Sequence, residues 1–196
     1  MTLRTTITRA DILPMDAFIA QRKEARARIV AIKRDRRVSL GPHATFYFES
    51  YDTMWWQIQE MLYIEKGGEE QLADELAAYA PLVPKGSELV ATFMIEVDDP
   101  PRRARVLATL GHIDRHLYIE FGGEKVYAVA EDDAERTRED GKTSAVHFLR
   151  FPFTAAQIAA FRQPNTRVLV GCDHDNYGHL AVMPETVRAA LAQDFA

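Results

Sequence analysis

Apolar residues recur at helical spacing near the N-terminus and at alternating spacing through much of the second half of the chain. The first pattern predicts amphipathic helices, and the second predicts half-buried strands bounded by Gly, Pro, Asn and Asp. The predicted helices cover residues 14–33, 53–66, 69–79, 100–110, 154–161 and 184–192. The predicted strands cover residues 37–40, 45–49, 89–97, 117–121, 125–129, 146–153, 167–172 and 179–183.

Several predicted strands are joined by turns too short to contain a crossover helix. Gly41-Pro42-His43 separates the first two strands, and Gly122-Gly123-Glu124 separates a later pair, so both pairs are predicted hairpins. We therefore expect an α+β fold, with an antiparallel or mixed sheet and helices packed on it, rather than a doubly wound fold. The length of 196 residues, with no repeat or linker, predicts a single domain over residues 1–196.

Composition and charge exclude several classes of protein. The net charge of -5 gives no support for nucleic-acid binding by the whole molecule. No segment approaches the roughly twenty apolar residues that span a bilayer, and the N-terminus lacks a signal-peptide pattern. The single cysteine, Cys172, excludes an intramolecular disulfide, and its place in an apolar strand predicts a buried, inert thiol. We therefore expect a cytoplasmic protein that does not associate with membranes.

One segment of the chain carries a local excess of positive charge. Residues 22–37 contain eight lysines and arginines against only Glu24 and Asp35. Because no nucleic-acid-binding motif surrounds this run, a solvent-exposed helix face is the favoured interpretation. Nucleic-acid binding through the run is a minor alternative, and it would show as salt-dependent retention on DNA or RNA.

Two polar residues interrupt the apolar strand predicted at 146–153. Alternation places His147 on one face and Arg150 on the other. A buried imidazole or guanidinium needs hydrogen bonds, a counter-charge or a metal. His147 is therefore either a hydrogen-bonded core histidine or a metal-binding or acid–base group, and Arg150 is either the partner of a carboxylate or an anion receptor.

The predicted helix at 53–66, capped by Asp52 or Thr53, carries a second set of polar residues within its apolar arc. Gln57, Met61 and Glu65 stand at i, i+4 and i+8, so they are predicted to point into the protein. Their neighbours on the helix, Gln59 and Glu60, are predicted to face solvent. A buried carboxylate needs a cation, hydrogen-bond donors or a proton, which the histidines and the arginine of the strand could provide. The candidate cofactor-binding residues are Gln57, Met61 and Arg150.

A third set follows the predicted strand 167–172, in the turn 173–178. Asp, Asn and Gly suit a turn without any function, yet strand ends are also common places for sites. One hypothesis is that imidazoles and carboxylates from the three sets converge on a divalent transition metal, Fe, Zn or Mn, with positions left open for a substrate. The predicted metal ligands are Glu65, His147, Asp173 and His174.

The chain contains no complete catalytic signature. HExxH, CxxC, GxSxG and Walker-type glycine motifs are all missing from the sequence, which disfavours the hydrolase, kinase and dinucleotide chemistries that they mark. The catalytic residues are therefore unknown at this stage, and the sequence leaves open whether the protein is an enzyme.

Five segments together carry a resemblance to a known family. They are Asp11-Ile12-Leu13-Pro14, Val38-Ser39-Leu40-Gly41-Pro42, residues 57–62, residues 142–151 and Asp173-His174. Over nearly its whole length the chain resembles the bacterial family named domain of unknown function 3501 (DUF3501). The activity of that family is undefined, so the resemblance carries over no catalytic residue. It implies a redox or oxidative-stress setting with a rubrerythrin-like or iron–sulfur protein as partner, because such proteins are encoded near members of the family.

Two classes of function follow from these observations. The favoured hypothesis is an accessory or binding protein in a redox setting, in which the buried polar residues form a structural network. The alternative is a metal-dependent enzyme that uses a site of histidines and carboxylates. Metal binding and assembly into a homo-oligomer are compatible with either class.

Overall fold

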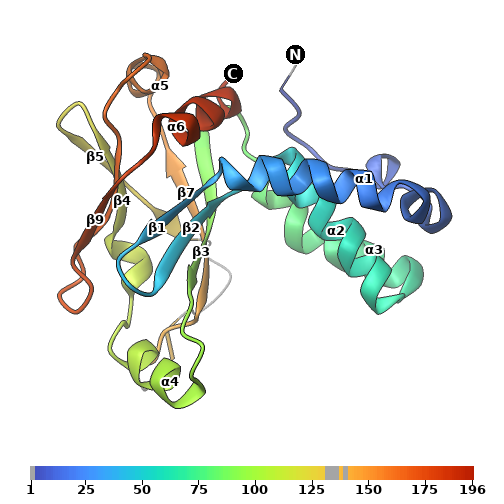
Figure 1. Ribbon diagram of the computed structural model, residues 1–196, viewed down its shortest axis with the longest axis horizontal. Helices are drawn as coiled ribbons and strands as arrows, with labels where there is room; N and C mark the ends of the chain where they lie inside the picture. The colour runs from blue at the N-terminus through green and yellow to red at the C-terminus, as the bar shows by residue number, and fades with distance from the viewer. Residues whose placement is uncertain (1–2, 131–136, 139–140) are drawn as a thin grey trace.

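The computed structural model describes residues 3–130, 137–138 and 141–196, and these residues form an α+β fold (Figure 1). Two antiparallel sheets pack face to face, and helices cover one sheet and the ends of both. The predicted fold class is confirmed. No helix of the described part of the chain is long and apolar enough to cross a membrane.

The larger sheet has the strand order β1-β2-β3-β7-β6. Its strands are β1 (Arg37–Leu40), β2 (Ala44–Phe48), β3 (Glu88–Ile95), β7 (Val146–Pro152) and β6 (Val129–Ala130). The smaller sheet has the order β5-β4-β8-β9. Its strands are β5 (Glu124–Tyr127), β4 (Leu117–Phe121), β8 (Leu169–Cys172) and β9 (His179–Val182). Only Ala128 separates β5 from β6, so one extended segment passes from the smaller sheet to the larger.

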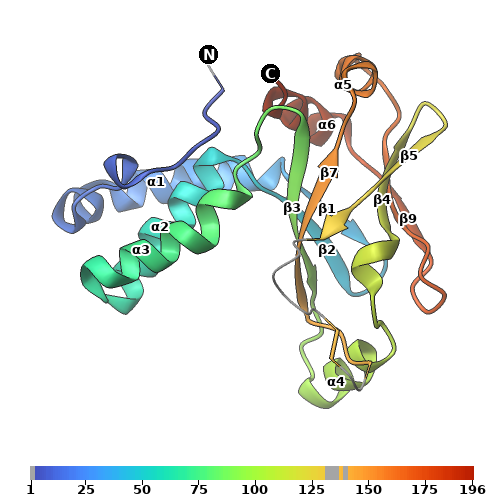
Figure 2. The same cartoon turned by 180° about the vertical axis from the view of Figure 1, so that it is seen from behind.

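The helices form two groups around this sandwich. The first group, α1 (Met15–Arg34), α2 (Tyr51–Glu65) and α3 (Gly68–Tyr79), projects to one side of the larger sheet (Figure 2). The remaining helices are α4 (Pro100–Ala108), α5 (Ala155–Arg162) and α6 (Glu185–Leu191). The short 3-10 turns are η1 (Arg9–Asp11), η2 (Ala80–Leu82), η3 (Ile113–His116) and η4 (Ala192–Asp194).

The core lies between the two sheets and is rich in aromatic residues. Phe46 packs on Phe93 of the neighbouring strand, with ring centroids 4.8 Å apart, and both side chains are fully buried. At one end of the sandwich, Phe161 and Phe195 pack edge to face at 5.6 Å. Burial of each such side chain stabilises the fold by roughly 1.5–3 kcal/mol. The alternating pattern of β7 is as predicted, with His147 facing this core and Arg150 on the opposite face.

The N-terminal end of α2 differs from the sequence prediction. Ser50, rather than Asp52 or Thr53, is the N-cap residue, and its Oγ accepts the backbone N–H of Thr53 at 3.3 Å. The Thr53 hydroxyl in turn accepts the backbone N–H of Ser50 at 2.8 Å. This reciprocal capping fixes the point where the chain leaves β2 and enters the helix.

The interior face of α2 also differs from the predicted arc. Gln59 is fully buried and its Oε1 accepts the backbone N–H of Leu13, at 2.7 Å. Glu60 receives two hydrogen bonds from Arg22 of α1, at 2.7 and 2.8 Å. The prediction that Gln59 and Glu60 face solvent is therefore wrong. The reason is that α1 and the segment before it cover a face of α2 that the sequence pattern had left open.

Candidate functional site

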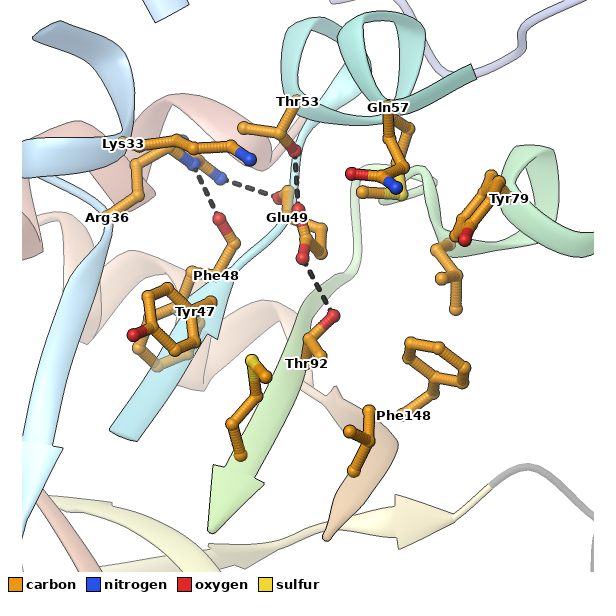
Figure 3. A pocket seen from close by; sticks show the side chains of 14 residues that line it. Lys33, Arg36, Tyr47, Phe48, Glu49, Thr53, Gln57, Tyr79, Thr92 and Phe148 are labelled. Atoms are coloured by element: carbon orange, nitrogen blue, oxygen red, sulfur yellow. Dashed lines mark hydrogen bonds between the residues drawn. The ribbon is translucent and has the colours of Figure 1, made fainter. Parts of the chain in front are cut away.

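A cavity of about 410 Å³ lies between the outer face of the larger sheet and the first group of helices (Figure 3). Its volume falls within the range of small-molecule sites, which is roughly 300–1,000 Å³. Side chains from α1, α2, the end of α3, η2 and three strands line it. Segments far apart in the sequence therefore meet at this point.

Strand register explains which side chains the sheet contributes to the cavity. Tyr47 of β2 lies opposite Thr92 of β3, which lies opposite Phe148 of β7. Neighbouring residues along each strand point to the core, so this row points to the helices. Met94 and Val146 form the next row on the same face.

Glu49 is the central polar residue of the cavity. It follows β2 two positions after Tyr47, and its backbone N–H donates to the carbonyl of Val90 at 2.7 Å, which continues the strand pairing. Only 7% of Glu49 is exposed. The hydroxyl of Thr53 donates to its Oε2 at 2.6 Å, and the hydroxyl of Thr92 donates to its Oε1 at 2.7 Å (Figure 3).

The carboxylate of Glu49 has neutral partners only. Among the described residues, no lysine, arginine or histidine nitrogen lies within 4.0 Å of it. The adjacent N-terminus of α2 supplies a partial positive charge, which favours an anion at this place. A carboxylate has about four acceptor positions, and two hydroxyl groups leave part of this capacity unused. Glu49 can therefore accept a further donor from a molecule in the cavity.

Arg36 holds the backbone next to Glu49 rather than its carboxylate. Its Nε donates to the carbonyl of Phe48 at 3.0 Å, and its Nη2 donates to the carbonyl of Glu49 at 2.7 Å. The same guanidinium forms a buried ion pair with Asp194 of η4. Arg36 thus ties the cavity wall to the C-terminal segment, and its charge is already compensated.

The remainder of the wall is largely apolar or aromatic. Tyr79 and Phe148 lie at the end of the cavity that is farther from Lys33 and Arg36 (Figure 3). Met54 and Leu82 add further apolar lining. At the opposite side, burial and a hydrogen bond to the carboxylate of Glu96 raise the pKa of Tyr47, so its phenol is neutral at physiological pH. The cavity therefore combines one acidic centre with a broad apolar surface.

The residues predicted to bind a cofactor are separated in the structure. Gln57 lines the cavity. Met61, one turn further along α2, is half-buried and is not among the residues described as lining the cavity. Arg150 forms an ion pair with Glu88 at 2.9 Å and donates to the carbonyl of Pro81 at 2.6 Å. Those contacts join β7 to β3 and to η2, which gives Arg150 a structural role.

The four predicted metal ligands lie in three separate places. Glu65 is exposed at the end of α2 and accepts a hydrogen bond from Gln71, so the prediction that it points inward is wrong. His147 is fully buried, and its Nε2 lies 3.0 Å from the carbonyl of Ser144, an arrangement that requires this nitrogen to donate. In the described residues, no group of three or more His, Cys, Asp and Glu side chains could hold a metal ion.

Asp173 and His174 join a surface cluster on the smaller sheet instead. Asp173 accepts hydrogen bonds from Tyr127 at 2.7 Å and His116 at 3.0 Å. Desolvation is the largest single effect and raises the pKa of Asp173, but these bonds and the positive charge of Lys125 together lower it. Both ring nitrogens of His174 are engaged, because Nε2 lies 3.1 Å from the carbonyl of Gly111 and Nδ1 accepts the N–H of Asn176. The contacts of His174 are those of a turn-stabilising residue.

Sequence reasoning missed Glu49, Thr53 and Thr92 as members of one site. One local signal was present, since alternation along the strand places Glu49 on the face of Tyr47, and a carboxylate just before a helix is favourably placed. The other partner, Thr92, lies 43 residues further along the chain. Only the pairing of β2 with β3 brings it to Glu49.

Comparisons with known proteins give a family and a fold but no activity. The model of the DUF3501 family, described as a protein of unknown function, matches residues 6–195. A crystal structure of a novel protein of unknown function from Burkholderia pseudomallei K96243 shares 40% sequence identity with the chain. The match covers 97% of this chain and 100% of that one, with a TM-score of 0.89. No curated protein matches the chain.

Proposed function

Since the chain belongs to the DUF3501 family, whose function is undefined, we propose a function from its cavity: the protein binds a small apolar molecule that carries a positively charged nitrogen. The observation that carries this proposal is the buried carboxylate of Glu49, which has two hydroxyl donors and forms no ion pair with any residue that the structure describes. A ligand ammonium would supply the missing counter-charge.

The physical reason is that a buried carboxylate gains more free energy from a charged partner than from neutral partners. A buried carboxylate that receives only neutral donors is less stable than one with a charged partner, because charge-assisted hydrogen bonds are roughly twice as strong as neutral ones. A cation entering the cavity would gain this interaction at a site that the fold has already desolvated. Aromatic rings of Tyr79 and Phe148 would add favourable contacts to an apolar or cationic ligand.

The same cavity supports a binding role rather than a catalytic one. Its described lining contains neither a histidine nor a cysteine, and the two threonine hydroxyls both donate to Glu49. We therefore propose an accessory or binding protein. The redox setting implied by the family resemblance is part of this proposal, with a rubrerythrin-like or iron–sulfur protein as the partner that receives or supplies the ligand.

Binding can be tested by titrating the protein with matched small molecules in a calorimeter. We expect apolar primary amines to bind and apolar carboxylic acids of the same size to bind at least tenfold more weakly. Glu49→Gln should reduce amine affinity by about tenfold or more, because it removes the charge while keeping a hydrogen-bonding group. Glu24→Gln, which removes an exposed charge from α1, is the matched control and should bind like the unaltered protein.

Two results would overturn the proposal. One is the absence of amine binding, and the other is equal affinity of the unaltered protein and the Glu49→Gln variant. The partner is tested separately, by measuring the retention of purified rubrerythrin-like and iron–sulfur proteins on the immobilised protein. If none of them is retained, the proposed partnership is wrong while ligand binding stands.

A further inference from the structure

Lys33 adds a second charge to the cavity. It lies in the last turn of α1, lines the cavity and is exposed at its edge. It forms no ion pair with any residue that the structure describes, including Glu49. A cation and an anion therefore line one small cavity without pairing with each other.

The order of these groups across the cavity is informative. Figure 3 shows Lys33 and Arg36 on one side of Glu49, and Tyr79 and Phe148 on the other. The charge of Arg36 is compensated by Asp194, so Lys33 supplies the positive charge that is available to a ligand. The cavity thus presents a cation, then a buried carboxylate, and then an apolar end.

Resting on the proposed function, we propose that the ligand is a free α-amino acid with a large apolar side chain. Its ammonium group would donate to Glu49, and its carboxylate would bind the ammonium of Lys33. The side chain would fill the apolar end, next to Tyr79, Leu82 and Phe148. Each charged group of the ligand would then meet an opposite charge, and the apolar side chain would leave water.

Other ligand classes fit these charges less well. A simple amine would satisfy Glu49 but would leave Lys33 without a role. A polyanion such as a nucleotide would be repelled by the carboxylate of Glu49, and an acid without an amine would leave Glu49 in contact with like charge. Residues within a peptide lack the pair of adjacent free charges. The cavity volume of about 410 Å³ is sufficient for a molecule of amino-acid size.

The test compares three amino acids with molecules that lack one charged group. L-phenylalanine, L-leucine and L-methionine are titrated by calorimetry beside the corresponding amines, phenethylamine, isoamylamine and 3-(methylthio)propylamine. The acids 3-phenylpropionate and 4-methylpentanoate lack the amine. We expect at least one amino acid to bind about tenfold more tightly than its amine, and the acids to bind more weakly than either.

Variants of two lysines on α1 separate a specific contact from a general charge effect. Lys33→Met should remove the preference for the amino acid over its amine while leaving amine affinity within about twofold. Lys23→Met removes an exposed charge from the same helix, outside the cavity lining, and should preserve the tenfold preference. Both positions are exposed, so neither variant disturbs the core.

The outcomes distinguish this inference from the proposed function. If the amines bind as tightly as the amino acids, or if Lys33→Met keeps the preference, the amino-acid assignment is overturned while amine binding through Glu49 stands. If neither amino acids nor amines bind, both proposals fail. A preference that is lost equally in Lys33→Met and Lys23→Met would show long-range attraction and would also overturn the assigned contact.

Discussion

Arg36 and Asp194 form a buried ion pair across 158 residues of sequence. Arg36 lies just before β1, and Asp194 ends η4 near the C-terminus. Burial raises the pKa of Asp194, because desolvation outweighs the attraction of the guanidinium. Since Arg36 also binds the backbone carbonyls of Phe48 and Glu49, this pair connects the C-terminal segment to the wall of the cavity.

Loss of this ion pair is expected to destabilise the whole protein. Asp194→Ala leaves the guanidinium of Arg36 buried without a counter-charge, which should lower the free energy of unfolding by about 3–5 kcal/mol. Asp35→Ala is the matched control, because the pair of Asp35 with Arg34 is exposed and should contribute less than about 1 kcal/mol. Urea unfolding followed by circular dichroism measures both. An equal decrease in the free energy of unfolding of the two variants would show that burial of the Arg36–Asp194 pair does not increase its contribution to stability.

Replacement of Gln59 and of Gln57, both on α2, by glutamate should change the stability of the protein by different amounts. Gln59→Glu places a carboxylate at a fully buried position where Oε1 accepts the backbone N–H of Leu13, and should lower the free energy of unfolding by about 3 kcal/mol or more at pH 7. The loss should shrink towards pH 4, because burial favours the protonated acid. Gln57→Glu, at a half-buried position, should cost less than about 1 kcal/mol. Thermal unfolding at both pH values distinguishes the two positions.

Position 41, in the turn between β1 and β2, should strongly favour glycine. Gly41 has a φ of +61°, and a Cβ atom there would lie 2.5 Å from Cδ2 of His179. Gly122 has a φ of +60° but no atom within 4 Å of such a Cβ. Gly122→Ala should therefore cost only the conformational penalty, about 1–2 kcal/mol, while Gly41→Ala should cost more because the ring of His179 must move. Similar melting temperatures for the two variants would contradict this explanation.

Cys172 should be unreactive in the folded protein. Burial raises the pKa of this thiol from 9.0 to about 11, so the folded state favours the protonated form. Its contribution to stability is complete below pH 9 and is lost as the pH rises through about 11. At pH 8 we expect iodoacetamide to modify the folded protein about a hundredfold more slowly than the urea-unfolded chain, because only the thiolate reacts. Equal rates in the two states would show that the thiol is accessible and normal in its ionisation.

The sequence predicted the elements of the fold because each is specified by nearby residues. The spacing of apolar positions defined α1, and alternation assigned His147 and Arg150 to opposite faces of β7. Helical periodicity did not identify the buried side of α2. The burial of Gln59 depends on α1 and the segment before it, and such contacts leave no periodic signal within α2 itself.

The candidate site was determined by tertiary structure. Local sequence patterns predicted the α+β fold, the approximate positions of its helices and strands, and which residues of β7 share a face, because backbone hydrogen bonding and side-chain alternation act over a few residues. Strand pairing brought Thr92 to Glu49, and packing of the C-terminal segment brought Asp194 to Arg36. These partners lie far apart in the chain, so the buried carboxylate became a candidate binding site only when the sheet and helices were assembled around it.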